Sequence, residues 1–449
     1  MKILIIGAGD VGFHLAFQLS SEEAHEVVVI ELNPERAQRI QDAMDAQVIE
    51  GNGASLGVLE RAGITGCDLV LAVTSSDEVN LMACLAASQY RVPVKIARVS
   101  KSDYYHEGGV LTPERLGVDL MINPERECAA ETHELLQSAA ITESIHFEGG
   151  LVQLVGMVVR EGAPIAGKTL MQLGAGGVRS RFLMVALVRG GRTVIPSGQD
   201  RVEPGDQIFV IGEPSRIPEL LPLAGYSGFK LRRVMVAGGS REAWFLARML
   251  EEHQVECTIL ERDRRRALEL AEGLDHCLVL HGDATDLDLL EMEAAGEADA
   301  FVAYTGSDET NLLSCLLAKN LGAPKVVSLV DRSDYIPLVT RVGVDAAVSP
   351  RRSTVNAILR YVRGGTVLAV ATLRGSEAEG IEFRVSDSFP HAGKRLAEVT
   401  FPKGSLAGAI IRQGRVIIPR GGDAIRVGDR VVMFVLPGAL PEVEELFAK

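Results

Sequence analysis

This sequence lacks the features that would place it in several specialised classes of protein. Its six cysteines show no Cys-x-x-Cys spacing and no clustered histidines, so we expect buried thiols rather than a disulfide framework or a metal site. No apolar run approaches the roughly 20 residues that a membrane-spanning helix needs. Met1-Lys2 leads directly into Ile3 to Ile6, without the longer apolar stretch of a signal peptide. These absences predict a cytoplasmic chain that reaches a membrane only through a partner.

An excess of basic residues is missing too. The formal net charge is −14 and the isoelectric point is near 5.3, which would repel the phosphate backbone of a nucleic acid. The one locally basic run, Arg262 to Arg266, is interrupted by Asp263 and indicates a solvated helical turn. We therefore expect no nucleic-acid partner. Apolar residues make up 47% and charged residues 24% of the chain, as in globular proteins, so the whole chain is expected to fold.

The chain is a duplication. Leu71 to Leu81 returns as Val302 to Leu312, 231 residues later. A second kind of module repeats as well, because Pro204-Gly205-Asp206 corresponds to Val427-Gly428-Asp429. At 449 residues the chain is long enough for four domains. We place them at residues 1–124, 140–227, 232–352 and 367–449.

Short β-branched runs alternate with helical stretches in the first module. Five runs indicate strands: Ile3 to Ile6, Glu26 to Ile30, Gln47 to Glu50, Leu69 to Val73 and Lys95 to Val99. Strands separated by helices form right-handed crossovers. We therefore predict an α/β fold with two Rossmann-like, doubly wound parallel-sheet domains. Runs such as Val152 to Val159, bounded by glycine- and proline-rich turns, predict that a small α+β domain follows each of them.

A glycine-rich motif, Gly7-Ala8-Gly9-Asp10-Val11-Gly12, follows the first predicted strand and opens a helix. In that context Gly7 allows a tight turn, Gly9 lets a pyrophosphate approach the backbone, and Gly12 lets the helix pack on the strand. Free N–H groups at the start of the helix then bind phosphate. The motif predicts a nucleotide site; a Rossmann fold that has lost its ligand is the alternative.

Glu31 closes the second predicted strand, nineteen residues after Gly12. A carboxylate at this position accepts hydrogen bonds from both ribose hydroxyls and repels a 2′-phosphate. Glu31 therefore favours NAD(H) over NADP(H). ATP or ADP, which offer the same ribose, remain open as ligands.

Three further candidates lie where later strands end, which is where open α/β sheets bind ligands. Gly51-Asn52 and Thr74-Ser75 are predicted to line the adenine and ribose. Thr74 and Asp77 also have the spacing of a helix capping box, a role compatible with ligand binding. Arg98 is interpreted either as a phosphate ligand or as part of a surface ion pair.

The second copy departs from this pattern. Its loop reads Gly238-Gly239-Ser240-Arg241-Glu242-Ala243, which puts a side chain at the second glycine position and a carboxylate in the place of Val11. Leu329 replaces Arg98. The positions that remain as candidates are Gly238, Gly239, Glu261, Asp283 and Thr305. Weak or altered nucleotide binding and a purely structural copy are both open for this half.

A catalytic constellation is missing from both halves. A dehydrogenase needs an acid or base poised over the nicotinamide, but the nine histidines are scattered and none recurs between the halves. We therefore predict a binding protein without catalytic or metal-binding residues. An NAD-dependent oxidoreductase, or a nucleotide-sensing regulator of another cation channel or antiporter, are the alternatives.

The order of modules, the loop Gly7 to Gly12, the segment Thr74 to Asn80 and the Pro204-Gly205-Asp206 pattern resemble the TrkA family, the peripheral regulatory subunits of bacterial Trk potassium uptake. The resemblance covers essentially the whole chain. Each half is similar to a regulator-of-potassium-conductance (RCK) N-domain followed by its C-domain.

The resemblance implies several properties that composition does not. NAD(H) or adenine nucleotides such as ATP or ADP would bind at Gly7 to Val11, Glu31, Gly51-Asn52, Thr74-Ser75 and Arg98. The chain would form a homotetrameric ring on the cytoplasmic face of the inner membrane. The ring would dock under a potassium-translocating subunit of the TrkH or TrkG kind and gate it.

Overall fold

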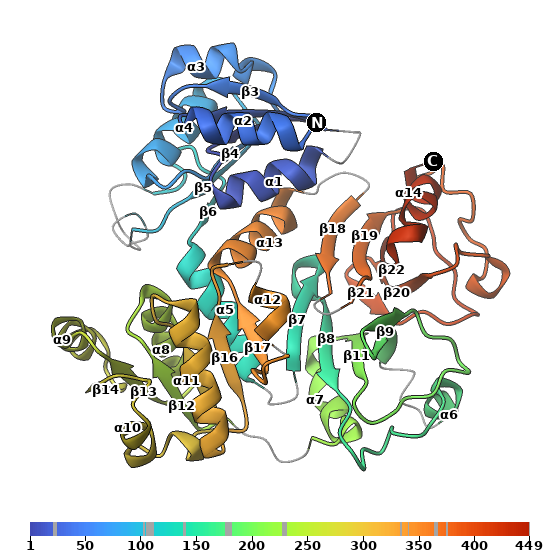
Figure 1. The fold of residues 1–449 in the computed structure, drawn as a ribbon. Coiled ribbons are helices and arrows are strands. Elements are labelled where there is room, and N and C mark those ends of the chain that lie inside the picture. Colours follow the sequence, from blue (N-terminus) through green and yellow to red (C-terminus); the bar gives the residue numbers. More distant parts are fainter. Residues whose placement is uncertain are drawn as a thin grey trace. The chain divides into compact units, whose positions relative to one another are not determined.

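The computed structural model describes residues 1–20, 25–101, 104, 112–137, 141–175, 182–226, 231–332, 335–339, 341–362, 367–373 and 376–448. The chain divides into two compact units. Unit 1 consists of Met1–Ala129 and Val348–Val362, and unit 2 of Ala130–Ala347 and Arg363–Lys449. Unit 1 therefore includes a short segment from the second half of the chain (Figure 1).

Unit 1 is built on a six-stranded parallel sheet with the order β3-β2-β1-β4-β5-β6. Its strands are β1 (Lys2–Ile6), β2 (Glu26–Glu31), β3 (Gln47–Glu50), β4 (Leu69–Ala72), β5 (Val94–Arg98) and β6 (Leu120–Ile122). The order reverses at β1, as in a doubly wound sheet. The five strands expected from the sequence are confirmed to within one residue at each end. The sequence pattern does not indicate β6.

Helices connect these strands. They are α1 (Asp10–Ser20), α2 (Pro34–Ala43), α3 (Leu56–Arg61), the 3₁₀ turn η1 (Ile64–Gly66) and α4 (Asp77–Gln89). After β6, α5 (Pro124–Leu136) leaves the sheet. A further helix, α13 (Pro350–Val362), comes from the second half and packs against α1.

The alternation of side chains along β1 creates two cores. Leu4 and Ile6 join a cluster with residues of α3 and α4 on one face of the sheet. Ile3 and Ile5 join residues of α1 and α13, among them Ile358, on the other face. Successive side chains of a strand point to opposite faces, so a continuous apolar run is what a doubly covered parallel sheet requires.

A second parallel sheet has the equivalent order β14-β13-β12-β15-β16-β17. Its strands are β12 (Arg233–Ala237), β13 (Glu256–Glu261), β14 (Leu278–His281), β15 (Ala300–Ala303), β16 (Val326–Leu329) and β17 (Ala346–Val348). Its helices are α8 (Arg241–Glu252), α9 (Arg264–Gly273), α10 (Leu287–Met292), α11 (Asp308–Leu321) and α12 (Ile336–Val339). The duplication seen in the sequence is thus a duplication of the fold.

Two five-stranded antiparallel sheets form the smaller modules. The first contains β7 (Ile141–Phe147), β8 (Val152–Val158), β9 (Phe182–Arg189), β10 (Arg192–Val194) and β11 (Gln207–Gly212), with α6 (Leu170–Ala175) and α7 (Ile217–Leu220). The second contains β18 (Val367–Thr372), β19 (Glu379–Arg384), β20 (Ser405–Arg412), β21 (Arg415–Ile417) and β22 (Arg430–Val435), with α14 (Leu440–Ala448). The expected α/β class with small α+β modules is confirmed.

The repeated Gly-Asp pattern has a structural role in both small modules. The carboxylate of Asp206 accepts two 2.7 Å hydrogen bonds from the guanidinium of Arg189. Asp429 is held by Arg412 in the same way, at 2.8 and 2.7 Å. Both aspartates are only 2% exposed. A bidentate arginine–carboxylate pair compensates for burying the charge, which explains why the aspartate occurs in both copies.

The two antiparallel sheets pack on each other within unit 2. Phe147 and Phe434 meet edge to face at 6.3 Å in a shared apolar cluster. Beside it, Glu382 accepts a 3.2 Å hydrogen bond from the Glu148 N–H, and Arg430 forms ion pairs with both carboxylates. Burial, followed by the side-chain hydrogen bond with the Glu148 carboxyl group, raises the pKa of Glu382 to about 7, whereas the bond from the Glu148 N–H lowers the pKa.

Five of the six cysteines are buried, as expected, but Cys277 is partly exposed. It precedes the edge strand β14, which has a neighbour on one side only, so the expectation is wrong for this residue. Among the helices that the structure describes, none is long and apolar enough to cross a bilayer.

Candidate functional site

The glycine loop after β1 requires two of its glycines for its own packing, but not the third. Gly7 has a φ of +99°, which side chains disfavour. A Cβ at Gly12 would lie 1.9 Å from the Gly7 carbonyl oxygen. A Cβ at Gly9 would meet no atom within 4 Å. The space at Gly9 is therefore open to a ligand, and no side chain at this position caps the first turn of α1.

Glu31 lies over this loop. Its carboxylate accepts hydrogen bonds from the Ala8 N–H and, at 2.8 Å, from the Asn33 N–H. The residue is 6% exposed. Each carboxylate oxygen accepts one of these bonds and keeps a second acceptor site, which a ribose hydroxyl can use. Glu31 is thus preorganised beside the loop at the carboxyl end of β2.

The turn after β3 adjoins Glu31. The Gly51 N–H donates to the Glu31 carbonyl oxygen at 2.9 Å, and a Cβ at Gly51 would press on Val58. Asn52 is exposed and its side chain accepts a 2.9 Å hydrogen bond from the Ala54 N–H. Asn52 therefore shapes the turn while its remaining polar groups face outward.

Thr74 connects the ends of β4 and β5 through Asn80. The Thr74 N–H and hydroxyl donate to Asn80 Oδ1 at 2.9 and 2.7 Å. Asn80 Nδ2 donates to the carbonyl oxygens of Thr74 and Arg98 at 3.1 and 2.8 Å. Asn80 is fully buried, so its amide fixes both strand ends at the sheet edge.

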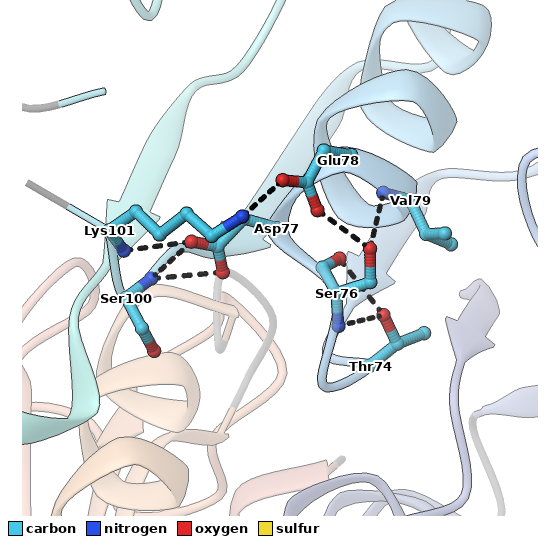
Figure 2. A network of polar contacts seen from close by, with 7 residues as sticks. All are labelled: Thr74, Ser76, Asp77, Glu78, Val79, Ser100 and Lys101. Atoms are coloured by element: carbon cyan, nitrogen blue, oxygen red, sulfur yellow. Dashed lines mark hydrogen bonds and ion pairs between the residues drawn. The ribbon is translucent and has the colours of Figure 1, made fainter. Parts of the chain in front are cut away.

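The capping box expected from Thr74 and Asp77 is wrong. Helix α4 is capped by Ser76, whose hydroxyl accepts a 3.3 Å hydrogen bond from the Val79 N–H. Asp77 instead accepts hydrogen bonds from the N–H groups of Ser100 and Lys101, as Figure 2 shows. Thr74 forms a turn with Ser76, because its hydroxyl oxygen accepts a 3.2 Å hydrogen bond from the Ser76 N–H. This whole edge is therefore rigidly connected, and the adjacent Ser75 is exposed.

Arg98 ends β5 and is partly exposed. Within the part of the chain that the structure describes, its side chain has no hydrogen bond or ion pair, so the surface ion pair considered above is not seen there. Arg98 ends its strand at the same edge of the sheet as the glycine loop and Thr74. Its role as a phosphate ligand stays a prediction.

A residue that sequence reasoning missed lies at the glycine loop. Arg351, near the start of α13, forms a 2.7 Å ion pair with Asp10. The pKa of His14, one turn further along α1, is lowered by burial and then by the charge of Arg351. The second half of the chain therefore brings a positive charge to the loop. No sequence signal pairs positions 341 residues apart.

The second loop is already occupied by the protein's own groups. Ser240 caps α8, its hydroxyl accepting a 3.3 Å hydrogen bond from the Ala243 N–H. Arg266 Nε donates to the Gly239 carbonyl oxygen at 2.7 Å. Glu261 accepts from the Gly239 N–H at 2.5 Å, as Glu31 does from the Ala8 N–H, so this bond is common to both loops. Gly238 keeps the positive φ of Gly7, at +94°. The second loop thus keeps the backbone conformation of the first loop, but the space that is open at Gly9 holds the Ser240 side chain instead.

The remaining candidates of the second copy repeat the local structure of the first. Thr305 bonds to Asn311 as Thr74 does to Asn80, and Asn311 Nδ2 donates to the Leu329 carbonyl oxygen at 3.1 Å. Asp283 accepts hydrogen bonds from the Thr285 N–H and hydroxyl, as Asn52 does from the Ala54 N–H, and these bonds lower the pKa of Asp283. The recurrence of Asn80 as Asn311 was visible in the sequence, but its role was not.

These groups together can bind an anionic ligand that carries a ribose. The first copy offers a helix N-terminus with open space, a ribose-type carboxylate and two arginines at one sheet edge. Among the described residues, no group of three or more histidine, cysteine or acidic side chains is arranged to hold a metal ion.

Comparison with known proteins supports the duplicated architecture. The family model described as the TrkA-N domain matches residues 3–124 and 234–350, and that of the TrkA-C domain matches residues 154–225 and 381–448. The chain is 38% identical to "Trk system potassium uptake protein TrkA homolog 2" of Methanosarcina mazei, covering 100% of both chains. It is 34% identical to "Trk system potassium uptake protein TrkA" of Halomonas elongata, covering 100% of this chain and 98% of that one.

A solved structure shows the same fold. The structure described as "GsuK channel bound to NAD" matches with a TM-score of 0.59 and 19% identity, over 100% of this chain and 79% of that chain. At that identity the likeness concerns the fold. The matched domains and the full-length relatives place this chain in the TrkA family of Trk system potassium uptake proteins.

Proposed function

We propose that this chain is a nucleotide-binding regulatory subunit that gates a Trk-type potassium transporter in the membrane. The observation that supports the proposal is the carboxyl edge of the first sheet, where the open glycine loop follows β1 and where Glu31 and Arg98 end β2 and β5. Its full-length relatives are named as potassium uptake proteins.

The ligand is NAD(H) or an adenine nucleotide such as ATP or ADP. Its phosphates would lie on the first turn of α1 at Gly9 to Val11, and its ribose hydroxyls would donate to Glu31. Gly51-Asn52 and Thr74-Ser75 would border the adenosine. The carboxylate of Glu31 disfavours a 2′-phosphate, so NADP(H) is expected to bind weakly.

The first copy is proposed as the competent site and the second as a structural copy. Ser240 caps the helix that would otherwise offer N–H groups to phosphate. Arg266 donates to the loop itself rather than to a ligand. Gly238, Gly239, Glu261, Asp283 and Thr305 therefore maintain the fold of the second sheet, and we expect one nucleotide per chain.

A ligand gates a transporter only by binding one conformation of the regulator more tightly than the other. Driving a gate from mostly closed to mostly open takes about 5 kcal/mol of differential binding. Several chains in a ring, a homotetramer by the family's pattern, can share that energy. The ring would act from the cytoplasmic face on a membrane-embedded subunit of the TrkH or TrkG type.

Calorimetric titration tests the binding claim. The wild type is titrated with NADH, NAD, ATP, ADP and NADPH, beside Gly9→Asp and the control Gly66→Asp. Both glycines have open space at Cβ, so both variants should fold, but only Gly9→Asp puts a carboxylate where phosphates bind. We expect binding of one nucleotide per chain to the wild type and to Gly66→Asp, and none to Gly9→Asp.

Two results would contradict the proposal. If the wild type binds no nucleotide, the Rossmann-like domains are scaffolds and the regulatory signal enters elsewhere. Oxidation or reduction of bound nicotinamide in the presence of a metabolite, followed by its absorbance, would instead indicate an oxidoreductase.

A further inference from the structure

The contact between Asp10 and Arg351 places a residue from the second half of the chain at the first glycine loop. Asp10 is the first residue of α1, directly after Gly9, and Arg351 is the second residue of α13. Helix α13 belongs to unit 1 and packs against α1 through Ile358 and Leu359. The position of Arg351 is therefore set by a hydrophobic core and does not depend on the ion pair alone.

Arg351 offsets an unfavourable charge in the loop. The Asp10 carboxylate stands at the helix end where phosphates would bind, and like charges repel. Its side chain is 58% exposed, whereas that of Arg351 is 24% exposed. Asp10 can therefore turn away into solvent, while Arg351 is held by its helix and the packing around it. A phosphate arriving at the loop can take over the guanidinium from Asp10.

The duplicated halves differ in charge at these two positions. Arg241 corresponds to Asp10 in the second loop, and Glu125 corresponds to Arg351 near the start of α5. In each half, the loop residue and the helix residue therefore carry opposite charges. The loop residue is acidic in the first half and basic in the second, and the helix residue is the reverse. Only in the first copy does the helix residue have the charge that attracts a phosphate.

We propose that Arg351 is a phosphate-binding residue of the first nucleotide site, so that the second half of the chain completes the site of the first half. The proposal rests on the proposed function and specifies its ligand recognition. Asp10 holds the guanidinium at the loop in the absence of nucleotide, and the phosphates replace Asp10 when nucleotide binds. Nucleotide binding then alters the contact between the loop and α13, which connects the site to the second half of the chain.

The test compares Arg351→Gln with Arg91→Gln in the full-length chain, titrated with ADP and with adenosine. Arg91 is exposed and precedes β5 at the opposite edge of the sheet, so the control removes the same charge from the same unit. A charge-assisted hydrogen bond to phosphate predicts that Arg351→Gln weakens ADP binding by about tenfold or more. Adenosine, which has no phosphate, should bind equally to all variants.

Asp10→Asn adds a second readout. Removing the competing carboxylate should tighten ADP binding several-fold in the wild-type background and have a smaller effect in the Arg351→Gln background. Equal ADP affinity in the wild type, Arg351→Gln and Arg91→Gln, with binding still abolished by Gly9→Asp, would overturn the role of Arg351 and leave the proposed function standing. Absence of ADP and NADH binding to the wild type would overturn both.

Discussion

Replacing Asn80 with alanine tests whether the polar network at the sheet edge holds the nucleotide site in addition to stabilising the fold. Asn80 is fully buried and makes four hydrogen bonds, to the N–H, hydroxyl and carbonyl groups of Thr74 and to the carbonyl oxygen of Arg98. Alanine would leave the Thr74 N–H and the Arg98 carbonyl without this partner. A buried backbone group that loses its partner costs about 1–3 kcal/mol.

We therefore expect Asn80→Ala to lower the free energy of unfolding of unit 1 by about 3 kcal/mol. The ends of β4 and β5 would also lose their connection, so Thr74 and Arg98 would no longer be held for a ligand. Nucleotide affinity should fall by about tenfold or more for a site loosened in this way. Urea unfolding and calorimetric titration measure the two effects.

The duplication supplies the matched control, Asn311→Ala. Asn311 makes the same bonds to Thr305 and to the Leu329 carbonyl oxygen in unit 2. It should destabilise unit 2 by a similar amount without changing nucleotide affinity. Equal losses of affinity in the two variants would show that Asn80 does not hold the nucleotide site, and unchanged stability of Asn80→Ala would show that its hydrogen bonds do not stabilise unit 1.

Three further predictions concern stability. Burial lowers the pKa of Lys325 from 10.5 to about 8, so the unfolded chain binds more protons than the folded chain between these pH values. The free energy of unfolding of the wild type should therefore rise by up to about 3 kcal/mol relative to Lys325→Met between pH 8 and 10.5, as measured by urea unfolding. The pKa of Glu382 is raised from 4.5 to about 7, so here the folded chain binds more protons and stability falls as the pH rises. Relative to Glu382→Gln, the free energy of unfolding of the wild type should fall by about 1–3 kcal/mol between pH 4.5 and 7. The same pH dependence in both proteins would contradict this prediction. Gly12→Ala should destabilise unit 1 because of its 1.9 Å clash, by about 1–3 kcal/mol, whereas Gly9→Ala should leave the unfolding curve unchanged and weaken nucleotide binding.

Much of the fold follows from local patterns. Runs such as Ile3 to Ile6 are apolar on both sides, as a sheet covered on both faces requires, and the strand ends were predicted to within one residue. The glycine loop and Glu31 could be located because their spacing is fixed by the turn and by the length of the crossover helix. These are properties of segments about thirty residues long.

Contacts between distant segments could not be predicted in the same way. The apolar face of α13 shows that the helix is buried, but not that it covers the first sheet rather than the second. The ion pair of Asp10 with Arg351 depends on that placement. The capping box was misassigned because the Thr74 hydroxyl is taken by Asn80, a choice that only the packing of α4 on β5 decides.

The most direct test of the account measures potassium flux. The chain is reconstituted in vesicles with a Trk-type membrane subunit, and uptake is followed while NADH, NAD, ATP or ADP is added to the side that carries the chain. We predict that at least one of these nucleotides changes uptake with the wild type and with Gly66→Asp, but not with Gly9→Asp. An identical nucleotide response with Gly9→Asp, or no response with a wild type that binds nucleotide, would contradict it.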